Sequence, residues 1–124
     1  MVRATAMALV LALAACAGQD NSASRFDNLS AEEIYRLAEA DLARGRADTA
    51  ADTFSEIERL YPYSEWAKRA TMMSAFSYHT AGFYDESRSA AQRYLDFYPT
   101  DEDAAYAQYL LALSYYEQID EVGR

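Results

Sequence analysis

Residues 45–62 read GRADTAADTFSEIERLYP, and residues 82–99 read GFYDESRSAAQRYLDFYP. Both stretches begin with glycine and end with Tyr-Pro, and a shift of 37 positions superimposes them. The same shift brings further residues into register: Asp48 with Asp85, Tyr78 with Tyr115, and Ala38 with Ala75 and Ala112. Agreement of turn residues and helix-face residues together indicates an internal repeat, and a period of this length is typical of a helical solenoid.

Glycine and proline divide residues 30–118 into five predicted helices, because glycine favours the left-handed conformation that ends a helix and proline cannot continue one. Ser30 and Glu33 have the spacing of a capping box, which satisfies free amides in the first helical turn. The expected helices run from Ser30 to Gly45 and then over 46–60, 64–80, 83–97 and 100–118, with Ser64 and Thr100 as N-caps and Asp103 at the box position of the last. Low β-branched content predicts no strand.

This pattern resembles the tetratricopeptide repeat, in which helices A and B of each unit pack closely at small residues. The resemblance implies an all-α solenoid of about two and a half units, over 30–63, 64–99 and a partial unit at 100–118. The matching packing positions are Ala38, Ala50, Phe54 and Ile57 in the first unit, and Ala75, Ser87, Ala91 and Tyr94 in the second. The match is divergent, since Ile34 and Thr71 replace the usual helix-A aromatic, and an unrelated array of helical hairpins is the alternative.

The N-terminus carries a targeting signal. Arg3 precedes an apolar run from Ala4 to Ala15, which is too short for a membrane span of about 20 residues. Leu-Ala-Ala before Cys16 resembles the signal of bacterial lipoproteins, which implies lipidation of Cys16 after removal of residues 1–15. The alternative is an ordinary signal peptide with an incidental cysteine. Ala17, where an aspartate would favour the inner membrane, indicates the outer membrane, and residues 16–29 are expected to form a flexible tether.

Composition excludes several classes of protein. The 124 residues carry a net charge of −9, and such an acidic body is repelled by nucleic acid. One cysteine and one histidine allow no disulfide framework and argue against a zinc site. The motifs of serine hydrolases, zinc proteases and phosphate-binding loops are absent from the sequence. We therefore expect no catalytic residues, no metal and no cofactor.

The whole chain resembles the N-terminal part of the BamD (ComL/YfiO-like) family of outer-membrane lipoproteins. The resemblance is carried by SAEEIYRLAEADLARGRADTAADTFSEIERLYPYSEWAKRA at residues 30–70 and LALSYYEQID at residues 111–120. It implies a lipid-anchored periplasmic scaffold of the β-barrel assembly machinery. The implied partners are the β-barrel assembly subunit, other assembly lipoproteins and unfolded barrel clients. The alternative is a repeat lipoprotein that serves a division or peptidoglycan complex.

Helix A of each repeat predicts a binding groove, because positions 2, 5, 9 and 12 of each unit lie on one stripe. The candidate peptide-binding residues are Tyr35, Arg69, Met72, Phe76, His79, Tyr106, Tyr109 and Tyr116. The family implies a client signal that ends in an aromatic residue with a free carboxylate, and we expect Arg69 to bind that carboxylate. The alternatives are that the aromatics pack as core, that Arg69 pairs with Glu65, and that His79 fills a surface position.

The family also implies further repeats beyond this sequence, so we expect the chain to be a fragment with 119–124 as a truncated tail. The apolar side of the fifth helix, with Leu110, Leu111, Leu113 and Tyr115, is then partly bare. Repeat arrays usually need three units for stability. We therefore expect this chain to be marginally stable or to self-associate.

Overall fold

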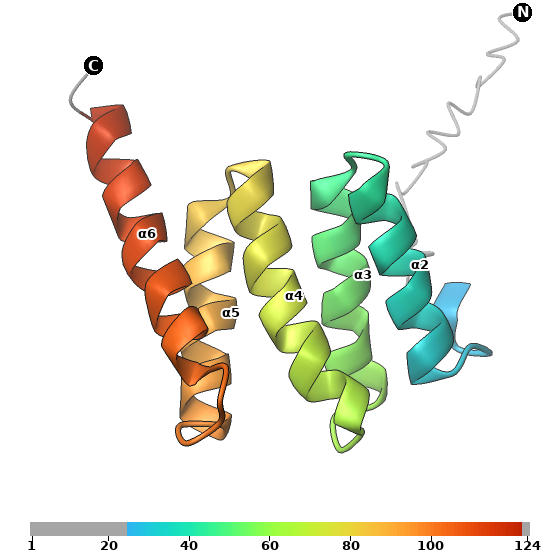
Figure 1. Ribbon diagram of the computed structural model, residues 1–124. Coiled ribbons are helices and arrows are strands. Elements are labelled where there is room, and N and C mark those ends of the chain that lie inside the picture. Colours follow the sequence, from blue (N-terminus) through green and yellow to red (C-terminus); the bar gives the residue numbers. More distant parts are fainter. Residues whose placement is uncertain (1–24, 123–124) are drawn as a thin grey trace, which may run out of the picture.

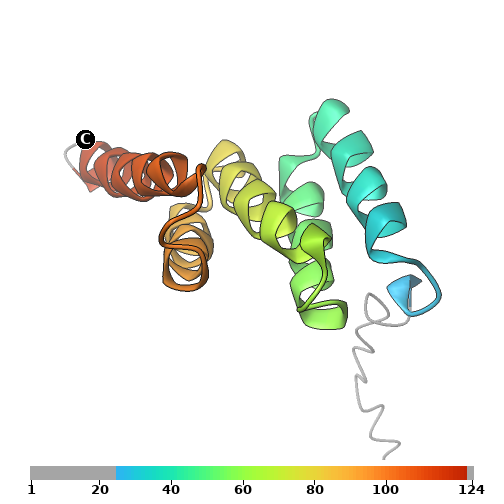
Figure 2. The same ribbon diagram turned by 60° about the horizontal axis from the view of Figure 1, so that its bottom comes forward.

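The computed structural model describes residues 25–122, which form five helices and no strand (Figure 1). The helices are α2 (Ala31–Ala43), α3 (Ala47–Leu60), α4 (Glu65–Ala81), α5 (Tyr84–Phe97) and α6 (Ala104–Val122). Each packs against the next along the chain, and α4 also contacts both α2 and α6. The predicted all-α repeat solenoid is thus confirmed, and Figure 2 shows the helices following one another across the array. None of the described helices is long and apolar enough to span a bilayer.

The predicted helix ends are largely as expected. The Ser30 amide donates to the Glu33 carboxylate at 2.8 Å, and the Glu33 amide donates to the Ser30 hydroxyl at 3.2 Å, which completes the capping box. The Ser64 hydroxyl caps α4 by accepting from the Ala67 amide. Gly82 ends α4 in the left-handed conformation, with a φ of 82°, where a side chain would introduce strain.

Two buried clusters form the core. The first joins α2, α3 and α4 around Ile34, Phe54 and Ile57, and the second joins α4, α5 and α6 around Tyr94 and Leu110. Small residues lie between the larger ones: Ala38, Ala50, Ala75, Ser87 and Ala91 are all fully buried. They let the paired helices approach closely, as the repeat pattern predicted.

The tether prediction is wrong for its last residues. Phe26 is only 3% exposed and belongs to the first core cluster, and Leu29 packs beside it. The Tyr61 hydroxyl donates a hydrogen bond to the Leu29 carbonyl, which fixes this segment to the α3–α4 turn. The residues around Phe26 and Leu29 are polar and show little periodicity, so the sequence pattern gave no reason to expect that these two side chains pack into the core. Residues 1–24, which include Cys16, lie outside the described residues.

The start of α6 also differs from the prediction. Residues 100–103 form turns, and the helix begins at Ala104, so Thr100 is not its N-cap. Asp101 organises this turn instead: its carboxylate accepts from the Asp103 amide at 3.1 Å, the Tyr94 hydroxyl at 2.5 Å and the Lys68 ammonium at 2.6 Å. A short-range pattern could not reveal these contacts, because Lys68 lies on another repeat.

The far end and the bare side of α6 need correction as well. Residues 119–122 continue the helix and are not a tail. Leu110, which was expected on the bare side, is buried against α5 at 2% exposure, and Leu111 and Leu113 are half-buried. Tyr115 is exposed as expected. The exposed side of α6 therefore lies at a different position around the helix axis from the side predicted by the sequence.

The Asp101 turn gives a test by pH. The ammonium of Lys68 and the hydroxyl of Tyr94 lower the pKa of Asp101 to about 2. Because the unfolded-state pKa is about 4, the stabilisation is complete above that pH and is lost as pH falls through the folded value. We expect Asp101→Asn to lower the unfolding free energy at neutral pH, by an amount that shrinks towards pH 2.

Chemical denaturation of both proteins across this pH range measures the difference. Glu102→Gln is the matched control, because Glu102 is exposed and has no ion pair among the described residues. An equal loss in the control, or a difference independent of pH, would contradict the role of Asp101.

The burial of Phe26 gives a second test. Phe26→Ala removes a buried aromatic side chain and is expected to lower the unfolding free energy by about 3 kcal/mol. Asn28→Ala, at an exposed position in the same segment, is expected to change it by less than about 0.5 kcal/mol. Urea unfolding followed by circular dichroism measures both, and equal small effects would mean that the segment is a tether after all.

Candidate functional site

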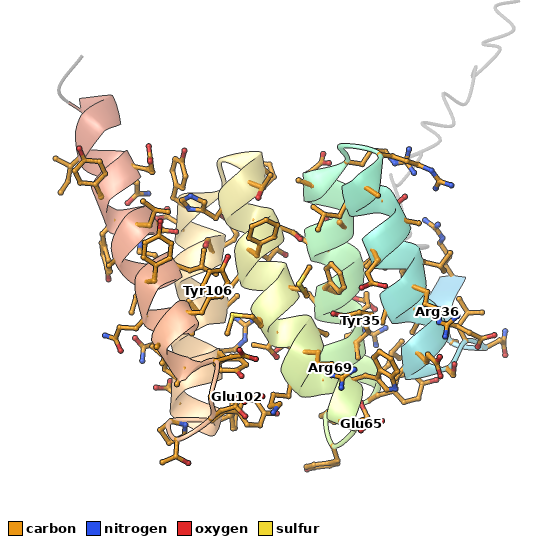
Figure 3. The ribbon with its side chains drawn as sticks, in the orientation of Figure 1. Tyr35, Arg36, Glu65, Arg69, Glu102 and Tyr106 are labelled. Atoms are coloured by element: carbon orange, nitrogen blue, oxygen red, sulfur yellow. The ribbon has the colours of Figure 1, made fainter. Side chains whose placement is uncertain are left out.

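The predicted groove residues lie on the face formed by α2, α4 and α6, and Figure 3 shows Tyr35, Arg69 and Tyr106 together on that face. The structure divides seven of the eight predicted residues into three groups. Two are core, two belong to an aromatic and cationic site between α2 and α4, and three are exposed on α6. The eighth, His79, is half-buried on α4 and bonds to α6.

Two of the predicted residues belong mainly to the core. Met72 is buried in the second cluster, and Phe76 is half-buried and packs against the same cluster. Core packing was the expected alternative for Phe76. The burial of Met72 was not predicted, because its position on the stripe does not show how closely α4 approaches α6. Neither side chain offers much surface to a ligand.

The first site residues are Tyr35 and Trp66. The ring of Tyr35 lies 5.0 Å from the ring of Phe54 and 5.0 Å from that of Trp66. Burial raises the pKa of the Tyr35 hydroxyl, and the nearby Glu39 carboxylate raises it further. Tyr35 is therefore a buried wall of the groove and stays protonated at neutral pH. Trp66 was not among the predicted residues, although its position three residues before Arg69 places both on one side of α4.

Arg69 completes this site, which we call the Trp66–Arg69 shelf and define as Tyr35, Trp66 and Arg69. The Arg69 guanidinium carbon lies 5.3 Å from the centre of the Trp66 ring, within the range of a cation–π contact. Among the described residues Arg69 makes no ion pair, and the suggested pairing with Glu65 is not formed. Its exposed donors therefore remain free to bind an anion.

Two shallow hollows border the shelf. One, of about 370 Å³, is lined by Tyr35, Arg36, Glu39, Trp66 and Arg69. The other, of about 430 Å³, lies on the opposite side of Arg69 beside Tyr63, Lys68 and Tyr98. Arg69 is the one residue that lines both, so an extended chain crossing the shelf would pass its guanidinium.

A larger hollow of about 640 Å³ lies elsewhere, between the segment at Arg25 and Phe26, the helix α3, and Tyr78. It contains none of the predicted groove residues. Its lining has two carboxylates, Asp52 and Glu56, and one cation, Arg25. Each of the two hollows at the shelf has two cations and one carboxylate. A ligand carboxylate would be repelled in the larger hollow, which favours the shelf for such a ligand.

His79 is held by a chain of hydrogen bonds. Its Nδ1 lies 3.0 Å from the Ser114 hydroxyl, which donates to the Ser87 hydroxyl at 3.0 Å, which in turn donates to the Ala75 carbonyl at 2.8 Å. Because each hydroxyl has one proton to give, Ser114 must accept from His79, so Nδ1 carries a proton. His79 thus connects α4 to α6, and the alternative that it only fills a surface position is wrong.

The predicted tyrosines of α6 form a third group on the groove face. The rings of Tyr106 and Tyr109 stack with centres 6.1 Å apart, and both are exposed, as is Tyr116. Burial raises the pKa of the Tyr106 hydroxyl, and Tyr109 adds to this effect. These rings form a second aromatic surface, separated from the Trp66–Arg69 shelf along the groove.

Comparison with known proteins places the chain in a family. The family model described as outer membrane lipoprotein, YfiO, matches residues 27–124. This chain belongs to the YfiO/BamD family of outer membrane lipoproteins. It is 34% identical over 99% of its length to the outer membrane protein assembly factor BamD of Caulobacter vibrioides.

Other relatives carry the same name. The chain is 37% identical over 74 residues to BamD of Rickettsia prowazekii and 28% identical over 110 residues to BamD of Neisseria gonorrhoeae. It spans 41% of the length of the Caulobacter relative, 30% of the Rickettsia relative and 41% of the Neisseria relative. The family resemblance drawn from the sequence is confirmed.

Within residues 25–122, no group of three or more histidine, cysteine or acidic side chains lies close enough together to hold a metal ion. The described surface offers a guanidinium with free donors, aromatic rings beside it, and further rings on α6.

Proposed function

We propose that this chain is a lipid-anchored scaffold of the outer-membrane protein assembly machinery, which acts by binding and not by catalysis. The observation that carries the proposal is the 34% identity, over nearly the whole chain, to a protein named as an outer membrane protein assembly factor. Lipidation of Cys16 would hold the repeat domain at the periplasmic face of the outer membrane. Its partners would be the β-barrel assembly subunit and other assembly lipoproteins.

The proposed client is the C-terminal segment of an unfolded barrel protein that ends in an aromatic residue with a free carboxylate. The Trp66–Arg69 shelf and the tyrosines of α6 together have groups for both parts of such a segment. Arg69 has donors not used by any described carboxylate, and a planar guanidinium suits a carboxylate ligand. The exposed rings of Tyr106 and Tyr109 offer a surface for upstream aromatic residues of the same segment.

Electrostatics favour contact at the shelf over contact elsewhere. The chain as a whole is acidic, with a net charge of −9, so a carboxylate is repelled from most of its surface. Arg69 and Arg36 line the same hollow, although Arg36 is paired with Glu32 at 2.5 Å. Arg69 is therefore the cation with the greater capacity for a new partner.

Peptide binding tests the client proposal. A labelled peptide that ends in phenylalanine with a free carboxylate is expected to bind saturably, and Arg69→Ala should weaken binding about tenfold through loss of a charged hydrogen-bonded pair. Tyr109→Ala should weaken it to a smaller extent. Arg44→Ala, which removes an exposed arginine at the far end of α2, is the matched control and should leave binding unchanged.

The same peptide with an amidated C-terminus separates the carboxylate contact from general aromatic binding. It should bind the parent protein as weakly as the free acid binds Arg69→Ala. Equal binding of amide and acid would contradict the role of Arg69, and no binding to a folded protein would leave a scaffold whose client site lies elsewhere.

Membrane placement and partners need a separate test in cells. Cys16→Ser is expected to release the chain from the outer-membrane fraction, because the lipid is then absent, whereas Ser22→Ala should leave it there. Capture of the chain from detergent-solubilised envelopes should recover the β-barrel assembly subunit. Recovery of a division or peptidoglycan complex instead would favour the alternative adaptor function.

A further inference from the structure

A hollow next to Arg69 is bordered by a ring that the fold leaves fully exposed. Tyr63 lies in the turn between α3 and α4, and its side chain is 101% exposed. An isolated exposed ring is common on protein surfaces and indicates nothing by itself. Tyr63 is not isolated, because it lines the hollow of about 430 Å³ together with Pro62, Arg69 and Tyr98. We call this hollow the Tyr63–Tyr98 hollow.

A second ring borders this hollow and is held in place. Tyr98 is half-buried, and its ring lies 5.2 Å from the buried ring of Tyr94. The Tyr98 carbonyl accepts from the Asp101 amide at 3.2 Å, and the Asp101 carboxylate accepts from the Lys68 ammonium at 2.6 Å. Lys68 is therefore engaged, and Arg69 is the cation of this hollow that forms no ion pair among the described residues.

The chemistry of a chain end limits where the last side chain of the client can lie. In a C-terminal residue, the side chain and the carboxylate are attached to the same Cα atom. If Arg69 binds the carboxylate, the side chain must enter a hollow that Arg69 borders. Arg69 borders the Tyr63–Tyr98 hollow and the hollow at Tyr35 and Trp66, and Figure 3 shows it on α4 between Tyr35 and Glu65.

Exposed ring surface differs between these two hollows. Each has two cations and one carboxylate, so charge does not distinguish them. In one, Tyr35 is 9% exposed and its ring packs against Trp66, whose ring also contacts the Arg69 guanidinium. In the Tyr63–Tyr98 hollow, both Pro62 and Tyr63 are exposed. An aromatic side chain therefore gains more ring contact in the Tyr63–Tyr98 hollow.

We propose that the Tyr63–Tyr98 hollow binds the aromatic side chain of the client's last residue, while Arg69 binds the carboxylate of that residue. This inference rests on the proposed client function and adds to it the place of the last side chain. Tyr63 is the specificity-determining residue, because its ring is not covered by the fold and can pack on the ring of the client. A small last residue such as alanine would leave the hollow unfilled, so the site distinguishes aromatic chain ends from small ones.

A double-mutant cycle between Tyr63 and the last residue of a peptide tests this inference in the full chain. Two labelled peptides are compared, identical except that one ends in phenylalanine and the other in alanine, each with a free carboxylate. Tyr63→Ala should weaken binding of the phenylalanine peptide about fivefold, because a contact between two rings is lost. The alanine peptide has no ring in the hollow and should not distinguish the two proteins.

Two further variants separate the hollow from its surroundings. Tyr63→Phe restores a ring and should recover most of the loss. Phe97→Ala is the matched control, because Phe97 is an exposed ring at the end of α5 that does not line the hollow, and it should leave binding of both peptides unchanged. Circular dichroism checks that each variant is folded, as the full exposure of Tyr63 leads us to expect.

The outcomes separate this inference from the client function on which it rests. Equal loss of both peptides with Tyr63→Ala, or loss of neither, would overturn the inference, and a remaining effect of Arg69→Ala would then leave the client function in place. A loss with Phe97→Ala as large as that with Tyr63→Ala would also overturn it, because the contact would not be specific to the hollow. If neither peptide binds the folded chain, the client function and the inference fail together.

Discussion

The close contact of paired helices at small residues is the constraint on which the rest of the structure depends. Ala38 and Ala50 make this contact in the first unit, and Ala75 and Ser87 take the same places in the second. A larger side chain at any of these fully buried positions would push the helices apart, and the two core clusters would lose their packing. In the second unit the Ser87 hydroxyl also uses the short separation to reach the Ala75 carbonyl.

Ion pairs connect one repeat to the next, on top of this packing. Lys68 of α4 binds Asp101 before α6, and Arg93 of α5 binds Glu58 of α3 at 3.1 Å. Each pair joins residues more than thirty positions apart, so it fixes the angle between units and not the form of a single helix. Among the described residues, Arg69 and Arg25 form no ion pair; each lies over an aromatic ring, Trp66 and Phe26 respectively, and a ring contact leaves hydrogen-bond donors unused.

Much of the fold could be predicted from the sequence, because the residues that begin and end its helices act locally. Gly45, Gly82 and Pro62 act through their own backbone geometry, and the Ser30 capping box acts within one turn. The candidate site was predicted less well. Stripe positions identify the face of a helix, but the distance between α4 and its neighbours decides whether Met72 is groove or core, and that distance depends on residues far away in sequence.

The same limit explains the errors at Thr100 and Phe26. Thr100 has the right chemistry for a cap, but Asp101 has three partners that the linear sequence does not place beside it. Phe26 lies in a polar segment, and its burial depends on the core cluster formed by α2, α3 and α4, whose residues are distant in sequence.

The attachment of the first described residues also has a mechanical consequence. A force pulling at Arg25 would reach the domain through Phe26 in the core and through the Tyr61 hydroxyl on the Leu29 carbonyl. These contacts must yield before tension reaches the first turn of α2. Because Tyr61 lies at the end of α3, the force is divided between α2 and α3 and does not act on the N-terminal end of α2 alone. The segment at 25–29 thus takes up tension applied at its N-terminal side before that tension reaches the helices of the repeat array.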